Sequence, residues 1–174
     1  MDINTLNQEL KNLRQRVADL EKNREADKLN IKKQKALMNV ITKIRTPLDL
    51  PTIFNTTVQE VRQLINADRV AVFKFYPDSN WNYGEFVSED FLPELPSVLY
   101  AQVHDHCFGS QYAINYQKGS FQAVADIYNA DLNPCHIKIL SQFQVRANLV
   151  LPLLQGQHLW GLLCVHQCKQ TRIW

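Results

Sequence analysis

Residues 149–167 read LVLPLLQGQHLWGLLCVHQ, and this stretch decides the fold class because it contains two runs rich in Leu and Val. Residues 149–154 and residues 159–167 each have the length and composition of a β-strand. The same character recurs in three upstream segments, at residues 69–76, 83–89 and 121–126. The sequence therefore predicts an α+β domain in which a five- or six-stranded antiparallel sheet is flanked by helices.

Two helices are predicted inside this domain. After Pro47, apolar residues recur at the spacing of an amphipathic helix that ends near Asn66: Leu50, Ile53, Phe54, Val58, Val61, Leu64 and Ile65. Further along, Asn133 followed by Pro134 is typical of a helix start, because Asn caps a first turn and Pro is tolerated at the first helical position. This second helix is expected to run to about Phe143.

The first 45 residues predict one long helix. Six apolar residues alternate at steps of three and four, which is the seam of a coiled coil: Ile3, Leu6, Leu10, Leu13, Val17 and Leu20. Arg24 and Asp27 occupy the next seam positions and weaken the pattern, and neither Gly nor Pro interrupts the helix before Pro47. We therefore expect residues 1–45 to be a helical linker that forms a parallel homodimer, and residues 47–174 to be the globular domain.

Length and composition limit the function classes. The chain has 174 residues and is 45% hydrophobic, which suits one domain plus an extension at roughly 150 residues per domain. Residues 1–45 carry 11 Lys and Arg against 6 Asp and Glu, but the two signs are interleaved at helical spacing, which indicates a solvated helix rather than a nucleic-acid surface. No apolar run reaches the roughly 20 residues that span a bilayer, and no secretory signal is present. A cytoplasmic location is expected, unless the fragment comes from a membrane-anchored receptor.

Cys135 is a candidate nucleophile. It falls in the first turn of the helix predicted to start at Pro134, where the positive end of the helix dipole stabilises a thiolate, and His136 is a titratable neighbour. In a reducing cytosol, the default for all four cysteines is a free thiol rather than a disulfide. The sequence therefore favours a reactive thiol at Cys135.

Cys107 is a second candidate. Asp105 supplies an acceptor that stays ionised at neutral pH, and His106 can take the thiol proton or add positive charge beside the sulfur. The remaining cysteines are expected to be inert, because Cys164 lies inside a predicted strand and Cys168 lies at its polar end. We assign neither of them a function.

Two other kinds of site use the same residue types. Zinc could be held by residues from both segments, namely His104, His106, Cys107, Cys135 and His136. Structural zinc sites usually show ligands two to four residues apart, whereas these form adjacent pairs, so the spacing disfavours a metal centre. A Cys–His hydrolase would need an oxyanion hole and a third orienting group, and no signature of one is present. We therefore expect neither a metal site nor an enzyme.

A combination of motifs resembles the GAF domains of cyanobacteriochromes, which are light sensors that hold a linear tetrapyrrole (bilin). The matching segments are residues 125–128, 135–136, 143, 145–150, 159–163 and 166–168. The resemblance covers most of residues 47–174. It implies a photoreceptor module whose pigment is covalently attached.

The resemblance assigns roles to individual residues. In this family the cysteine of a Cys-His pair forms the thioether to ring A of the bilin, a role that falls on Cys135, and the neighbouring His136 would pack against the pyrrole rings. Asp105, Cys107 and Phe108 match the Asp-X-Cys-Phe signature of one subfamily. In that subfamily the second cysteine adds reversibly at C10, between rings B and C, and absorption moves to blue or violet because the conjugated system is interrupted.

Further expectations follow from the same resemblance. Asp105 would lie near the pyrrole nitrogens, where a carboxylate accepts N–H hydrogen bonds, and His166 would contact ring D. The implied cofactor is phycocyanobilin or phycoviolobilin, switching by 15Z/15E isomerisation between blue or violet and green or longer wavelengths. The chain stops at Trp174, where family members continue into a helix that leads to an output domain.

Two alternatives without a pigment stay open. A GAF domain could bind a small molecule such as a cyclic nucleotide, or only dimerise, but no Gly-rich cradle for a phosphate is present and the two cysteines would lack a purpose. A coiled-coil scaffold is the other alternative. Ligand binding by residues 47–174 would distinguish the pigment module from both.

Overall fold

The computed structural model of the chain describes residues 3–45 and 49–174. The chain divides into two compact units, Met1–Thr42 and Lys43–Trp174. Among the described residues, no helix is both long enough and apolar enough to cross a membrane.

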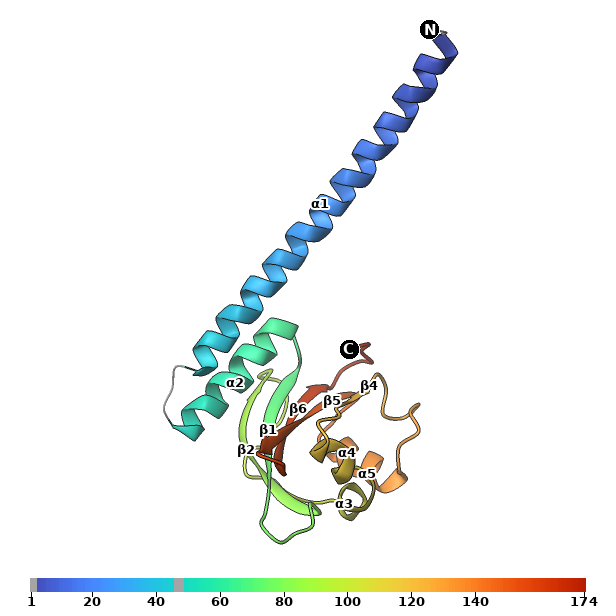
Figure 1. Ribbon diagram of the computed structural model, residues 1–174. Helices are drawn as coiled ribbons and strands as arrows, with labels where there is room; N and C mark the ends of the chain where they lie inside the picture. Colours follow the sequence, from blue (N-terminus) through green and yellow to red (C-terminus); the bar gives the residue numbers. More distant parts are fainter. Residues whose placement is uncertain (1–2, 46–48) are drawn as a thin grey trace. The chain divides into compact units, whose positions relative to one another are not determined.

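Helix α1 (Ile3–Arg45) is continuous over 43 residues, which confirms the long N-terminal helix (Figure 1). At about 1.5 Å per residue it is about 65 Å long. Three of the predicted seam residues are more than half exposed along it: Leu13, Val17 and Leu20. The side chains of the other three, Ile3, Leu6 and Leu10, lie outside the described residues.

The apolar seam of α1 resumes beyond its polar interruption. Ile31 and Met38 lie two and three heptads after Val17, and their side chains are 51% and 60% exposed. They therefore occupy the same face of a heptad repeat as Val17. The heptad pattern of apolar residues therefore extends further along α1 than its first six positions indicate.

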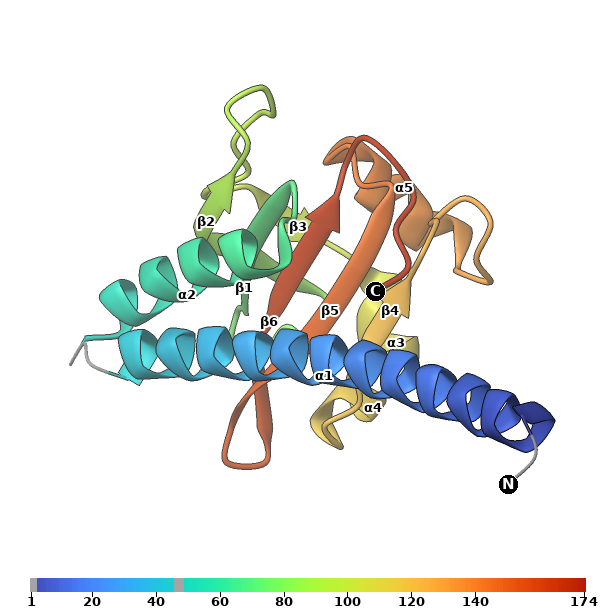
Figure 2. The same cartoon turned by 90° about the horizontal axis from the view of Figure 1, so that it is seen from above.

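The second unit is built on a six-stranded sheet with the order β3-β2-β1-β6-β5-β4 (Figure 2). Every neighbouring pair of strands is antiparallel, which confirms the predicted sheet. The strands are β1 (Arg69–Phe75), β2 (Tyr83–Phe91), β3 (Gln102–His104), β4 (Gln122–Val124), β5 (Ala147–Gln155) and β6 (His158–Gln167). Strand β3 was not predicted, because two of its three residues are polar and it forms no apolar run.

One face of the sheet is covered by helix α2 (Leu50–Ile65). Its start is capped by Asp49, whose carboxylate accepts a hydrogen bond from Thr52 N at 2.9 Å, and it ends at Asn66 in the left-handed conformation. This matches the predicted end of the helix. Val58 of α2 is fully buried against the sheet, and the rings of Phe54 and Trp160 stack at 5.2 Å.

The opposite face carries three shorter helices: α3 (His106–Gln111), α4 (Ala113–Gln117) and α5 (Pro134–Gln142) (Figure 1). Helix α5 begins as predicted, because the Asn133 side chain accepts a hydrogen bond from Cys135 N at 3.0 Å. Helices α3 and α4 were not predicted, since each is shorter than two turns. Both are needed to complete the site described below.

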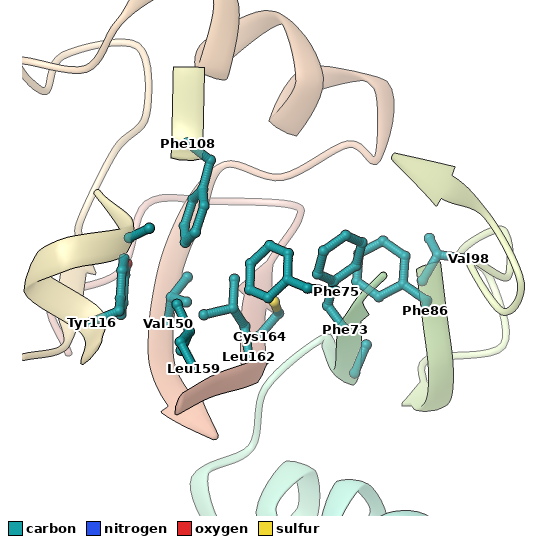
Figure 3. Packing of buried hydrophobic residues seen from close by; sticks show 12 residues of the cluster. Phe73, Phe75, Phe86, Val98, Phe108, Tyr116, Val150, Leu159, Leu162 and Cys164 are labelled. Atoms are coloured by element: carbon teal, nitrogen blue, oxygen red, sulfur yellow. The ribbon is translucent and has the colours of Figure 1, made fainter. Parts of the chain in front are cut away.

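The two faces follow from strict alternation along the central strands. Val70 and Val72 of β1 pack toward α2, whereas Ala71, Phe73 and Phe75 pack in the core on the other side. Figure 3 shows this second core, in which aromatic rings from β1, β2, α3 and α4 surround Leu162 and Cys164 of β6. An aromatic layer therefore lines the side of the sheet that faces α3, α4 and α5.

Candidate functional site

A cavity lies in this aromatic layer, between the sheet and the three short helices. Its volume is about 70 Å³. Four of the six predicted site residues line it: Asp105, Phe108, His136 and His166. The other two, Cys107 and Cys135, are direct chain neighbours of lining residues. Seven Phe, Tyr and Trp side chains line the cavity, namely Phe108 and also Phe73, Phe75, Trp81, Phe86, Tyr116 and Phe143.

Asp105 joins two elements of the site. One oxygen of its buried carboxylate caps α3 by accepting hydrogen bonds from Cys107 N at 3.1 Å and Phe108 N at 3.0 Å. The other oxygen lies 2.6 Å from Nδ1 of His136, in the first turn of α5. An imidazole N–H that donates to this carboxylate fixes the ring's tautomer and orientation. Asp105 therefore holds the starts of α3 and α5 side by side.

Cys107 and Cys135 meet as a consequence of that arrangement. Their Cα atoms lie 6.7 Å apart, and the structure joins the two sulfurs as a disulfide. The separation falls within the range of about 4.4–6.8 Å that disulfides span. The expectation of four free thiols did not anticipate this pair, because two capped helix starts bring together cysteines 28 residues apart in sequence. The expectation holds for Cys164 and Cys168.

The cavity face also carries a row of buried polar side chains across three strands. His166 of β6 pairs with Arg69 of β1 on one side and with Asn148 of β5 on the other. All three residues are at most 2% exposed. Each keeps one buried atom without a hydrogen-bond partner among the described residues, namely His166 Nδ1, Arg69 Nε and Asn148 Oδ1. Leaving such a group unpaired costs about 1–3 kcal/mol, so a polar ligand that reached the two residues of the row that line the cavity, His166 and Asn148, would find hydrogen-bonding atoms there.

A fourth such atom belongs to Asn82, which lines the cavity together with Asn148 and His166. Within residues 3–45 and 49–174, no hydrogen-bond partner is found for the buried Asn82 Oδ1, in the loop that precedes β2. This loop approaches α3 closely: a Cβ added at Gly109 would overlap the carbonyl oxygen of Asn80, so α3 needs a glycine at this point. A planar, conjugated ligand that carries N–H and C=O groups would match both the aromatic walls and these orphaned atoms.

Burial dominates the ionisation of the cavity residues. It lowers the pKa of His166 to about 3, and the nearby Arg69 guanidinium acts in the same direction. His166 is therefore neutral at physiological pH. Burial raises the pKa of the Cys164 thiol to about 12, and it also raises the pKa of the Tyr116 hydroxyl. Neither group supplies a nucleophile, so Cys164 is inert, in accordance with the sequence analysis.

Several residues of the site were missed by the sequence analysis. Arg69 is completely buried, and its guanidinium donates to the backbone oxygens of Phe143 at 2.9 Å and Pro96 at 2.8 Å. Asn82 and Asn148 received no role. For Asn148 a signal existed, since it lies two residues before Val150 in a strand and so shares the inward face with it. For Asn82, which lies in a loop, the sequence offers no such periodicity.

The residue types also provide a group of metal ligands. His106, Cys107 and Cys135 each place one ligand atom within 4.8 Å of the others. They come from both predicted segments, so their spacing in sequence does not reflect their separation in space. His104, also considered in the sequence analysis, is the last residue of β3, and its ring centroid lies 6.3 Å from that of His106.

Comparisons with known proteins identify the family of the second unit. Residues 49–174 match the model of the GAF domain family. Over 154 residues the chain is 39% identical to a putative methyl-accepting chemotaxis protein of Synechocystis sp., and over 168 residues it is 33% identical to the circadian input-output histidine kinase CikA of the same organism. These matches cover 88% and 85% of the chain, but the chain spans only 15% and 22% of the length of the two relatives.

Solved structures with the same fold also match the chain. A far-red absorbing dark state with bound biliverdin superposes with a TM-score of 0.72 at 34% identity, covering 80% of this chain and 86% of that one. The blue-light absorbing form of the PixJ GAF domain of Thermosynechococcus elongatus superposes with a TM-score of 0.66 at 35% identity, covering 74% and 78%. The chain therefore belongs to the GAF domain family, and the cyanobacteriochrome GAF domains are among its structural relatives.

Proposed function

We propose that the chain is a photoreceptor module that covalently holds a bilin, phycocyanobilin or phycoviolobilin, in the cavity beneath α3 and α5. The observation that carries the proposal is the meeting of a cysteine pair, the Asp105–His136 pair and a row of orphaned polar atoms around one aromatic cavity. A bound bilin would supply the light-driven 15Z/15E isomerisation. The chain's own residues would attach, orient and shield it.

Cys135 is the proposed anchor to ring A. Its position in the first turn of α5 favours the thiolate, and addition of the thiol across a double bond needs no leaving group, since sulfur bonds to one carbon and the proton goes to its neighbour. Cys107 is the proposed second, reversible link to the pigment, at C10. Both steps require the disulfide to be reduced first, by two electrons and two protons from a thiol reductant.

Reduction of the disulfide is also needed to make room for the pigment in the cavity. Ligand pockets usually have about 300–1,000 Å³, whereas this cavity has about 70 Å³. The disulfide ties the start of α3 to the start of α5, next to the lining residues Phe108 and His136. Breaking it lets the two helix starts separate, so that entry of the pigment and exposure of the two nucleophiles depend on the same bond.

The remaining residues orient the pigment. Asp105 offers carboxylate oxygens for pyrrole N–H groups, and its partner His136 lines the cavity. The His136 ring packs against Tyr112 at a tilt of 39°, with the ring centroids 5.5 Å apart. His166 stays neutral and buried, so its unpaired Nδ1 can exchange a hydrogen bond with a carbonyl or an N–H group of ring D. Phe108 packs against Phe75 and Tyr116 and closes the aromatic wall.

The signalling part of the proposal concerns α1. Its heptad seam, with exposed apolar residues from Leu13 to Met38, fits a second copy of the same helix in a parallel dimer. A change of contacts around the pigment would then bias the pair of helices and an output domain beyond this chain. The chemotaxis-protein and histidine-kinase names of the relatives are consistent with a sensory input module.

The decisive experiment is attachment of the pigment in cells that synthesise phycocyanobilin. We expect the purified chain to be coloured, to photoswitch, and to keep its pigment in acid urea and on a denaturing gel that is stained with zinc. Cys135→Ala should lose the stable attachment, whereas Cys168→Ala should keep it, because Cys168 lies outside the cavity. A colourless chain, or equal labelling of both variants, would refute the proposed anchor.

A further inference from the structure

The group formed by His106, Cys107 and Cys135 is the only set of three potential metal ligands of this kind among the described residues. Two of its members belong to the first turn of α3, and the third belongs to the first turn of α5. The three ligand atoms lie within 4.8 Å of one another. A single ion placed between them can therefore reach all three with small side-chain movements.

The donor set selects the class of metal. Two thiolates and one imidazole suit Zn²⁺ and disfavour Ca²⁺ and Mg²⁺, which prefer oxygen ligands. With Zn–S bonds of about 2.3 Å and tetrahedral geometry, two sulfurs on one ion lie about 3.8 Å apart. The Cα separation of 6.7 Å is near the upper end of the disulfide range, so the two helix starts leave room for an ion between the sulfurs.

The surroundings support this arrangement. Cys107 N and Cys135 N are both held by capping side chains, Asp105 and Asn133, which fix the backbone on which the two sulfurs are carried. His106 is exposed and Cys135 is partly exposed, so two of the three ligands can be reached from solvent without opening the cavity. Asn133 Oδ1 lies 3.7 Å from the Cys107 sulfur and provides a polar neighbour on the other side.

We propose that the chain with reduced thiols binds one Zn²⁺ ion through Cys107 Sγ, Cys135 Sγ and a ring nitrogen of His106, with water as the fourth ligand. Reduction of the disulfide takes two electrons and two protons from a thiol reductant, and metal binding releases the two thiol protons to solvent without any redox change at the ion. The ion and the pigment then compete for the same sulfurs. This last consequence rests on the proposed function, whereas metal binding itself does not.

Binding is tested on the full chain without pigment. The protein is reduced, freed of reductant under anaerobic conditions and titrated with Co²⁺, whose thiolate complexes show charge-transfer and tetrahedral ligand-field bands; Zn²⁺ is then used to displace it. We expect one equivalent of Co²⁺, with both bands lost on addition of Zn²⁺. Chain oxidised to the disulfide should give neither band. Absence of the bands from the reduced chain would overturn the proposal.

Variants identify the ligands. Cys107→Ser and Cys135→Ser should each weaken Zn²⁺ binding, measured against a coloured chelator, by about 100-fold or more, and His106→Ala by about 10-fold or more. Cys168→Ser is the matched control and should bind as the unmodified chain does, because its sulfur lies outside the group. His104→Ala tests the choice of histidine: a loss equal to that of His106→Ala would overturn the assigned ligand. Circular dichroism verifies that each variant is folded.

The competition has its own measurement. Chain preloaded with one equivalent of Zn²⁺ should attach phycocyanobilin at least about 10-fold more slowly than the reduced metal-free chain, and a chelator should restore the rate. Equal rates would refute the competition. If the reduced chain attaches pigment but shows no metal bands, the zinc site is wrong and the proposed function stands. If it binds metal stoichiometrically but never attaches pigment, the proposed function is wrong and the zinc site stands.

Discussion

The buried His166 makes the stability of the domain depend on pH in a predictable way. Its side chain is 2% exposed, and burial together with Arg69 lowers its pKa to about 3, against an ordinary value of 6.5. Between these two values the unfolded chain binds a proton at His166 and the folded chain does not. Lowering the pH therefore stabilises the unfolded state, and the free energy of unfolding falls as the pH drops below about 6.5.

The size of the effect follows from linkage. One proton bound only by the unfolded chain changes the free energy of unfolding by about 1.4 kcal/mol per pH unit. From pH 6.5 to pH 4.5, the contribution of His166 is therefore a loss of about 2–3 kcal/mol. This is a large part of the 5–15 kcal/mol that is typical of a folded protein.

The assay is urea unfolding followed by tryptophan fluorescence at several pH values between 7.5 and 4.5. All three tryptophans, Trp81, Trp160 and Trp174, lie in the second unit, so the signal reports this unit and not helix α1. His166→Gln removes the titrating group and keeps a polar side chain. The unmodified chain should lose about 2–3 kcal/mol more than this variant over the lower two pH units.

Carboxylates titrate in both the unmodified chain and His166→Gln, so their contribution to the free energy of unfolding cancels when the two are compared. His158→Gln is the control, since His158 is exposed at the first position of β6, and this variant should follow the unmodified chain. If the unmodified chain and His166→Gln lost stability in parallel down to pH 4.5, the burial argument for His166 would be refuted.

Three further predictions follow from the site and from α1. In the pigmented protein, Cys107→Ala should keep a bound pigment through Cys135 but lose its blue or violet band and absorb at longer wavelength in the dark; an unchanged dark spectrum would contradict the second thioether. Asp105→Ala should lower the free energy of unfolding by about 2–4 kcal/mol, because it removes the cap of α3 and a buried hydrogen bond to an ionised group; a loss below about 1 kcal/mol in urea unfolding would contradict this account. Val17→Glu combined with Leu20→Glu should shift sedimentation from dimer to monomer, and an unmodified chain that is already monomeric would exclude the seam as an interface.

The sequence predicts the parts of the fold that repeat. Runs of six or more residues with the composition of a strand predicted five of the six strands, although β4 is only three residues long within its predicted range of 121–126. The start of α5 followed from Asn133 and Pro134, whose local chemistry suffices to begin a helix. Strand β3 and helices α3 and α4 have three to six residues, too few for a period to emerge. They form because the remainder of the domain supplies their partners, as when β3 pairs with β2 at Tyr83 and Gly84.

The candidate site was likewise predictable from the sequence only in part. Motif residues could be selected from the sequence, but the distance between Cys107 and Cys135 depends on the Asp105–His136 contact, which is tertiary. The polar row formed by Arg69, His166 and Asn148 depends on the register of three strands that are far apart in the chain. Pairing register is set by turns and by packing of the whole sheet, so no local pattern could have revealed it.

The disulfide, the proposed zinc site and the proposed pigment attachment all use the same two sulfur atoms, those of Cys107 and Cys135. Cys107 and Cys135 can form a disulfide with each other, and our proposals add a shared zinc ion and one or two bonds to a bilin. These states exclude one another, because a sulfur in a disulfide has no thiolate to offer and two sulfurs held on one zinc ion are not free to reach two carbons of a pigment. It follows that the reduction potential of this disulfide, measured against glutathione, and the concentration of available zinc together set the fraction of chains that can accept pigment. A potential well below that of the cellular glutathione pool would keep the sulfurs oxidised and the cavity closed, whereas a higher potential would leave the pair ready for metal or pigment.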